Sequence, residues 1–227
     1  MQTTEKVLNT AEGMAFGTYQ AWPESPKGGL VLIHEAFGIT PHIKRTCDGY
    51  ATDGYAVVAP ALFSALHGPN APVYPYNING LNEARAQIPQ IPQQTVLAMV
   101  KACMDELQAK GLKVATIGYC WGGSVAYYSA AQLPGVAACV SYYGGMIEQL
   151  TTQMQPLCPT ICHLAKLDRY IPVEAAQANL AQYHPAAQVY VYQADHGFNR
   201  DDGVTWDAEA AALARARTLE LFDKTIS

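Results

Sequence analysis

Residues 113–123 read Lys-Val-Ala-Thr-Ile-Gly-Tyr-Cys-Trp-Gly-Gly, and this stretch decides the fold. The run from Lys113 to Tyr119 is mostly apolar or β-branched, which predicts a buried strand. Small and apolar residues follow and predict a helix from Trp121 to Gln132. Only Cys120 separates the two elements, so the chain passes from strand to helix within one residue.

The turn at Cys120 matches the pattern Gly-x-Ser-x-Gly of a nucleophile elbow, with Cys in the place of Ser. Glycines at the flanking positions let the helix pass close to the strand. A helix N-terminus favours negative charge and therefore the thiolate, which is the reactive form of cysteine. The pattern predicts that Cys120 is a nucleophile. The alternative is a close-packed turn that holds a buried, inert cysteine.

Strands and helices alternate on both sides of this stretch. The other strands are predicted at 29–34, 55–59, 136–142, 160–167 and 188–193, with an antiparallel edge strand at 14–21. The other helices are predicted at 41–53, 93–110, 173–183 and 207–222. This alternation predicts an α/β fold, with a mostly parallel central sheet and helices on both faces, as a single domain over residues 1–227. The Pro- and Asn-rich segment 61–92 is predicted to be a long functional loop.

Composition excludes several classes of protein. The 227 residues are 50% apolar, and 14 Lys and Arg against 19 Asp and Glu give a net charge of −5. An apolar half excludes intrinsic disorder, and the acidic balance predicts neither nucleic-acid binding nor attachment to anionic membranes. The chain shows no secretory signal and no apolar run that could span a bilayer, which predicts a cytoplasmic protein. We expect a monomer or a small homo-oligomer.

The six cysteines form no Cys-x-x-Cys pair and are expected to be free thiols. The sequence Cys158-x3-Cys162-His163 fits no standard zinc site, so no metal is expected. The glycines of residues 118–123 lack the spacing and the context of a dinucleotide-binding turn. No cofactor is therefore predicted.

Side chains that carry chemistry are predicted at one edge of the sheet. Glu35, Cys120 and Asp168 each follow a predicted strand directly, and His196 follows another within a few residues. Active sites form beyond the carboxyl ends of the strands in such sheets. Cys120, Asp168 and His196 also occur in the order of nucleophile, acid and base in α/β hydrolases. The alternatives are a helix N-terminal acid at Asp168 and an uninvolved loop histidine at His196.

These residues, with several other segments, resemble the dienelactone hydrolase (carboxymethylenebutenolidase) family of the α/β hydrolases. The resemblance covers nearly the whole chain from residue 30 onward. The Cys elbow together with an upstream Glu in a His-Glu-x-Phe-Gly setting is specific to this family. The similar segments are residues 34–39, 53–60, 118–123 and 142–144, the segment around Asp168, and residues 196–200 and 214–219.

The resemblance implies an α/β-hydrolase fold and a role for each residue that matches the family's motifs. Cys120 would be the nucleophile, His196 the base and later the acid, and Asp168 the group that orients His196. Glu35 matches an extra carboxylate that keeps the thiol neutral at rest and helps to deprotonate it when substrate arrives. The implied reaction is the ring opening of a dienelactone to a maleylacetate-type product, in aromatic degradation.

Three further residues are implied to bind the substrate. The backbone N–H groups of Ala36 and Trp121 match the oxyanion hole. Arg200 matches an arginine that binds a substrate carboxylate, because a guanidinium pairs with a carboxylate through two hydrogen bonds. The implied partner is therefore a small ester or lactone that carries a carboxylate. The alternative for Arg200 is an ordinary surface arginine.

The chain departs from the family pattern at two places near the substrate. Ala61 follows Pro60 where the family usually has Asp, and Arg85 lies out of register with the family's second arginine. Three alternatives to a dienelactone hydrolase therefore stay open: a carboxylesterase with broader specificity for small esters or lactones, a non-catalytic binding protein with the same fold, and a redox-sensing thiol protein.

Overall fold

The computed structural model describes residues 1–227, which divide into two compact units, Met1–Val114 and Ala115–Ser227. The single domain expected from the sequence stays a prediction. The strands form an eight-stranded, mostly parallel sheet in the order β1-β2-β4-β3-β5-β6-β7-β8. The α/β fold with a mostly parallel sheet is therefore confirmed. None of the helices is both long and apolar enough to cross a bilayer.

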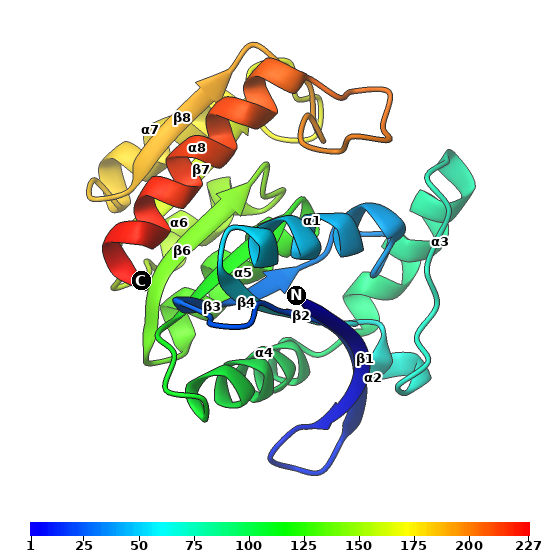
Figure 1. Ribbon diagram of the computed structural model, residues 1–227. Helices are drawn as coiled ribbons and strands as arrows, with labels where there is room; N and C mark the ends of the chain where they lie inside the picture. The colour runs from blue at the N-terminus through cyan, green and yellow to red at the C-terminus, as the bar shows by residue number, and fades with distance from the viewer. The chain divides into compact units, whose positions relative to one another are not determined.

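The first unit holds four strands that are wholly its own (Figure 1). β3 pairs with β4 in parallel, whereas β2 pairs with β1 and with β4 antiparallel. Every residue of β3 and β4 is buried, which is why both read as continuous apolar runs. The strands are β1 (Gln2–Asn9), β2 (Ala15–Trp22), β3 (Gly28–Ile33) and β4 (Tyr55–Pro60).

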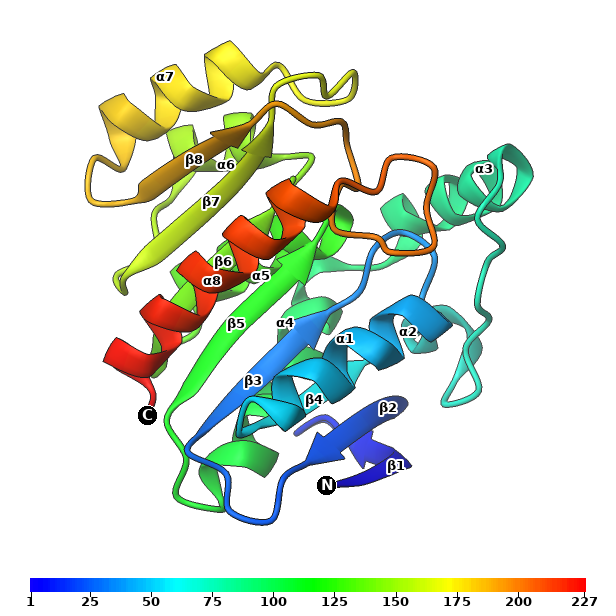
Figure 2. The ribbon, with the colours of Figure 1, turned by 45° about the horizontal axis from the view of Figure 1, so that its top comes forward.

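Helices cover this part of the sheet on two sides. α1 packs on β2 and β4, and α4 packs on β3 and β4 from the other side (Figure 2). Pro41 opens α1 at a position where its missing N–H costs nothing, and Thr40 caps the helix. The helices of this unit are α1 (Pro41–Thr52), α2 (Ser64–His67), α3 (Ile78–Gln87), α4 (Gln93–Gln108) and the 3-10 turn η1 (Ile88–Gln90).

Two sequence predictions for this unit need correction. β1 was not predicted, because seven of its eight residues are exposed and leave no alternating pattern. β1 takes the edge of the sheet, so the predicted strand at 14–21 exists as β2 but is not an edge strand. The segment 61–92 is not one long loop, because it contains α2, α3 and η1. α3 buries only Gly80 and Ala84, so its sequence has no apolar stripe from which a helix could be predicted.

The second unit continues the sheet from β5, whose first residue Val114 closes the first unit. β6, β7 and β8 are parallel neighbours, and both α5 and α8 pack on β6. Figure 2 shows α8 across one face of these strands and α7 beyond the other face. The elements are β5 (Val114–Tyr119), α5 (Trp121–Gln132), β6 (Val136–Tyr142), α6 (Ile147–Gln153), β7 (Thr160–Ala165), α7 (Val173–Tyr183), β8 (Gln188–Tyr192) and α8 (Ala208–Thr225).

Candidate active site

Cys120 forms the whole turn between β5 and α5. Its backbone has φ 55° and ψ −121°, a conformation that a residue with a side chain rarely adopts. The Cys120 N–H donates to the carbonyl of Tyr142 at 2.9 Å, which ties the turn to the end of β6. Strain of this kind persists only where surrounding contacts hold it, and it gathers at functional sites.

Glycines on both sides of Cys120 are required by close contacts. A Cβ at Gly118 would lie 1.9 Å from the carbonyl oxygen of Gly122, so β5 and α5 touch backbone to backbone. A Cβ at Gly123 would lie 2.7 Å from the carbonyl oxygen of Tyr142. Both separations are far below a van der Waals contact. The glycine requirement predicted for the elbow is therefore confirmed at Gly118, and Gly123 adds a second one in the packing of α5 against β6.

Asp168 and His196 meet beyond the ends of β7 and β8. Asp168 Oδ2 lies 2.6 Å from His196 Nδ1, while Asp168 Oδ1 accepts from the backbone N–H groups of Tyr170 at 2.8 Å and Ile171 at 3.2 Å. The carboxylate side chain is fully buried and the imidazole is 14% exposed. Because Asp168 can only accept, Nδ1 of His196 must carry a proton, which leaves Nε2 to face the nucleophile.

The third member of this set is the thiol. Cys120 hydrogen-bonds to the imidazole of His196. Burial lowers the pKa of His196, but the negative charge of Cys120 and the hydrogen bonds to Asp168 and Cys120 outweigh it and raise the pKa to about 10. The structure thus favours a proton on the imidazole beside Cys120. It brings together the three residues that the sequence predicted as nucleophile, base and acid.

Two tyrosines that the sequence did not single out hold the imidazole. The ring of Tyr143 lies 5.0 Å from that of His196, and the ring of Tyr170 lies 5.2 Å from it at nearly a right angle. Tyr143 has φ 36°, and its N–H donates to the carbonyl of His163 at 2.8 Å. The only signal in the sequence is that Tyr170 is close to Asp168 and that Tyr143 belongs to the family-like segment 142–144.

Arg200 lies in the loop that leads from His196 to α8. Its side chain is 16% exposed, and its Nε lies 3.9 Å from Asp202 Oδ1. A Cβ at Gly203 would lie 2.5 Å from the same Nε, so the loop folds tightly around the guanidinium group. The structure therefore holds Arg200 in one place by packing and by charge, in the same unit as Cys120, Asp168 and His196.

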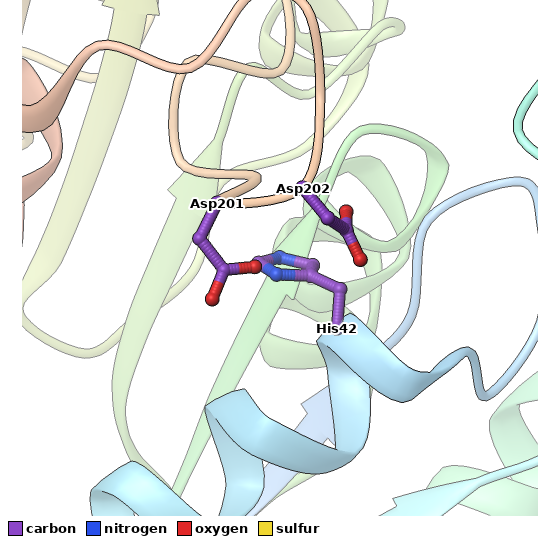
Figure 3. A group of neighbouring side chains, drawn as sticks. All are labelled: His42, Asp201 and Asp202. Carbon is purple, nitrogen blue, oxygen red and sulfur yellow. The ribbon is translucent and has the colours of Figure 1, made fainter.

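One group of three side chains is of the type that could hold a metal ion. Figure 3 labels Asp201 and Asp202 in the loop after Arg200 and His42 near the start of α1. The two aspartates belong to the second unit and His42 to the first. We assign no metal to them, and the absence of cofactor and metal stays a prediction.

The remaining cysteines differ from Cys120 in their surroundings. All six are free thiols, and only Cys120 and Cys158 are partly exposed. Burial raises the pKa of Cys158 to about 11 and that of Cys162 to about 12, so neither forms a thiolate readily at neutral pH. Cys120 is the one cysteine that combines exposure with a basic partner. Selective modification of Cys120 follows from this contrast.

Glu35 and Ala36 belong to the first unit, two and three residues beyond β3. Both are buried, Glu35 to 2% exposure and Ala36 to 3%. The hydroxyl of Tyr76 donates to Glu35 Oε2 at 3.2 Å. Neighbouring His34 accepts from the N–H of Leu62 on Nε2 and lies 2.5 Å from the carbonyl of Glu35 with Nδ1, which makes it a neutral structural histidine.

A strained cysteine after β5, followed by an acid and a histidine after β7 and β8, is the arrangement of an α/β hydrolase. The comparisons with known proteins define the family. The model of the dienelactone hydrolase family matches residues 16–226, so the chain belongs to the dienelactone hydrolase family and is a hydrolase of ester or lactone bonds.

Relatives cover almost the whole chain. A carboxymethylenebutenolidase of Pseudomonas sp. (strain P51) is 28% identical over 99% of this chain and 96% of its own length. Carboxymethylenebutenolidase 1 of Cupriavidus pinatubonensis is 27% identical over 94% of each. The crystal structure of a dienelactone hydrolase from Anabaena variabilis shares 16% identity and superposes with a TM-score of 0.73 over 100% of this chain and 99% of its own. The fold of that structure is the fold found here.

Proposed function

We propose that this protein is a cysteine-dependent hydrolase that opens small lactones or cleaves activated enol esters. The observation that carries the proposal is the set of Cys120, His196 and Asp168. The thiol of Cys120 is hydrogen-bonded to the imidazole of His196, and the buried carboxylate of Asp168 holds the Nδ1 of that imidazole. Family membership supports the reaction class. The names of the curated relatives support a lactone of the dienelactone type as substrate.

The reaction runs in two steps. The Cys120 sulfur forms a bond to the substrate carbonyl carbon, and the tetrahedral oxyanion collapses as the ring C–O bond breaks and the leaving oxygen takes its electrons. His196 gives the proton on its Nε2 to that oxygen, which leaves the imidazole neutral and able to accept a proton in the second step. Water then attacks the thioester while His196 accepts a proton from it, and the carboxylic acid leaves as Cys120 regains the thiolate.

Backbone N–H groups stabilise the oxyanion. Trp121 is the first residue of α5, and N–H groups in the first turn of a helix bind anions. By family resemblance, the N–H of Ala36 is the second donor. Losing one such donor typically costs about 10²–10³ in rate, so this stabilisation is a large part of catalysis.

The nucleophile itself limits the substrate class. A thiolate is a better leaving group than an alkoxide, so an intermediate formed on an ordinary alkyl ester returns to reactants. A substrate whose leaving oxygen becomes a stabilised enolate moves forward instead. This preference favours enol lactones over alkyl esters, and it agrees with the family.

Glu35 and Arg200 complete the proposal. Glu35 is the carboxylate that the family resemblance assigns to control of the thiol proton. Arg200 binds the substrate carboxylate, which replaces Asp202 as the partner of the guanidinium group. Replacing Asp202 by Asn removes that competing charge. We therefore expect Asp202→Asn to lower the KM for a carboxylate-bearing lactone, and Arg200→Ala to raise it about tenfold or more.

The test is a substrate panel measured with and without prior alkylation by iodoacetamide. It contains a dienelactone, its neutral methyl ester, a p-nitrophenyl ester and a simple alkyl ester. We expect alkylation-sensitive turnover of the dienelactone and the activated ester and almost none of the alkyl ester. Equal rates on all four would indicate a general carboxylesterase. Equal effects of Arg200→Ala on the dienelactone and its methyl ester would remove Arg200 from carboxylate recognition.

A further inference from the structure

We propose that Tyr76 is a positioning residue for Glu35, and that its hydroxyl group holds the carboxylate in the orientation that the reaction uses. The inference rests on the proposed role of Glu35. Tyr76 lies in the segment 61–92, where the sequence departs from the family pattern.

The hydrogen bonds around Tyr76 have a fixed direction. Its hydroxyl donates to Glu35 Oε2 at 3.2 Å and lies 2.7 Å from Thr40 Oγ1. A phenol has a single proton, and here the carboxylate takes it, so Thr40 must be the donor in the second bond. Thr40 also caps α1 by accepting from the N–H of Ile43 at 3.4 Å. A directed chain of hydroxyl groups thus runs from the start of α1 to Glu35.

Contacts hold both the ring of Tyr76 and the backbone on either side of it. It packs edge-on against Phe37 at 4.6 Å, and the N–H of Tyr74 donates to the carbonyl of Phe37 at 2.9 Å. On the other side Asn77 caps α3 through the N–H of Gly80 at 2.9 Å. The hydroxyl of Tyr76 therefore sits on a backbone that is tied down at both ends.

Glu35 needs such a donor. The Glu35 side chain is 2% exposed and has lost most of its water, so its oxygens need hydrogen bonds from the protein instead. A hydroxyl donor on one oxygen also fixes the rotation of the carboxylate. Loss of the hydroxyl should therefore weaken the action of Glu35 and leave the packing of the ring in place.

The test compares Tyr76→Phe with Tyr74→Phe in single-turnover acylation of Cys120 by a dienelactone. Both substitutions delete one phenolic hydroxyl from the same segment, but the ring of Tyr74 packs on Phe63 instead, at 5.0 Å. We expect Tyr76→Phe to slow acylation about tenfold, which is the usual effect of a lost hydrogen bond to a charged group, with KM changed less than twofold. Tyr74→Phe should leave the rate within about twofold of the parent.

A double-mutant cycle shows whether Tyr76 acts through Glu35. In the Glu35→Gln background, Tyr76→Phe should add less than a twofold effect, because the carboxylate that it serves is gone. An equal slowing in both backgrounds would overturn the inference, as would an unchanged rate for Tyr76→Phe or for Glu35→Gln. Thermal unfolding of each variant identifies any loss of stability, and the cycle is measured where all variants are folded.

Failure of this inference differs from failure of the proposed function. If Cys120→Ala still forms an acylated protein, the cysteine mechanism is wrong whatever Tyr76 does. If acylation requires Cys120 but the cycle shows no coupling between Tyr76 and Glu35, only the positioning role is lost.

Discussion

The two oxygens of Asp168 have different partners, and this difference decides which nitrogen of His196 carries the proton. Oδ1 accepts two backbone N–H groups, those of Tyr170 and Ile171, and Oδ2 faces His196 Nδ1. An Asn at this position would keep its oxygen on the backbone N–H groups and turn its NH2 group toward Nδ1. His196 would then accept there and carry its proton on Nε2, which is the wrong tautomer for a base.

Asp168→Asn should therefore lower kcat by about 10³–10⁴, as the same tautomer error does in serine enzymes, with little change in thermal stability. Steady-state kinetics on a dienelactone and a thermal melt measure both quantities. Asp195→Asn is the matched control, because Asp195 Oδ1 accepts from the backbone N–H of His196 at 2.7 Å and an amide oxygen can do the same. Comparable losses of kcat in the two variants would argue against a tautomer effect.

At the scale of the element, the strand-to-helix turn requires that Gly118 has no Cβ atom. A Cβ at Gly118 would meet the carbonyl carbon and oxygen of Gly122 at 2.3 and 1.9 Å, so α5 would have to move away from β5. The turn would then lose the geometry that presents Cys120. A Cβ at Gly145, by contrast, would meet no atom within 4 Å.

Gly118→Ala should destabilise the protein by roughly 3 kcal/mol or more, because backbone atoms cannot yield as a flexible side chain can. Gly145→Ala, which meets nothing within 4 Å, should change the free energy of unfolding by less than about 0.5 kcal/mol. Urea unfolding of both variants measures the difference. A stable Gly118→Ala variant with an alkylation-sensitive Cys120 would contradict the backbone-contact account of the elbow.

Elements that bury a continuous apolar run were predictable from the sequence, and elements that do not were missed. β3, β4 and β5 are buried at every position, and each was predicted within two residues at either end. β1 and α3 are largely exposed, so neither leaves a pattern. Their existence depends on pairing and packing with elements already in place, which local sequence does not record.

The candidate site divides in the same way. Two signals made its main residues predictable: each follows the end of a predicted strand, and Cys120, Asp168 and His196 occur in the chain order that α/β hydrolases use. Tyr143 and Tyr170, whose rings flank His196, were not, because an aromatic residue in a loop carries no periodicity. Tyr76 was missed for the same reason, since its bond to Glu35 joins residues 41 positions apart.

At the scale of the whole molecule, buried histidines link stability to pH. Burial lowers the pKa of His34 to about 4 and that of His163 to about 3, both below the value of about 6.5 for an unfolded chain. Below pH 6.5 the unfolded chain therefore binds more protons than the folded protein. The stability that these two histidines contribute is fully present above that pH and falls as the pH drops toward 4, by about 1.4 kcal/mol per pH unit for each histidine.

His163→Gln should remove one of these two contributions. His163 bonds to Tyr192 at 2.9 Å and to Thr218 at 3.0 Å, and a glutamine amide offers both a donor and an acceptor to such partners. We expect the free energy of unfolding, measured in urea between pH 6 and pH 4, to fall less steeply by about 1.4 kcal/mol per pH unit. A slope equal to that of the parent would show that His163 takes up no proton on unfolding.

The central claim is that Cys120 carries the acyl group, and rapid-quench intact-mass analysis tests it most directly. The protein is mixed with a dienelactone, quenched in acid within the first turnover and mapped by peptide mass. We predict an adduct of one substrate mass on the peptide that contains Cys120, formed and lost at rates that account for turnover, and no adduct and no turnover in Cys120→Ala. Turnover without an adduct, together with an active Cys120→Ala variant, would contradict the cysteine mechanism.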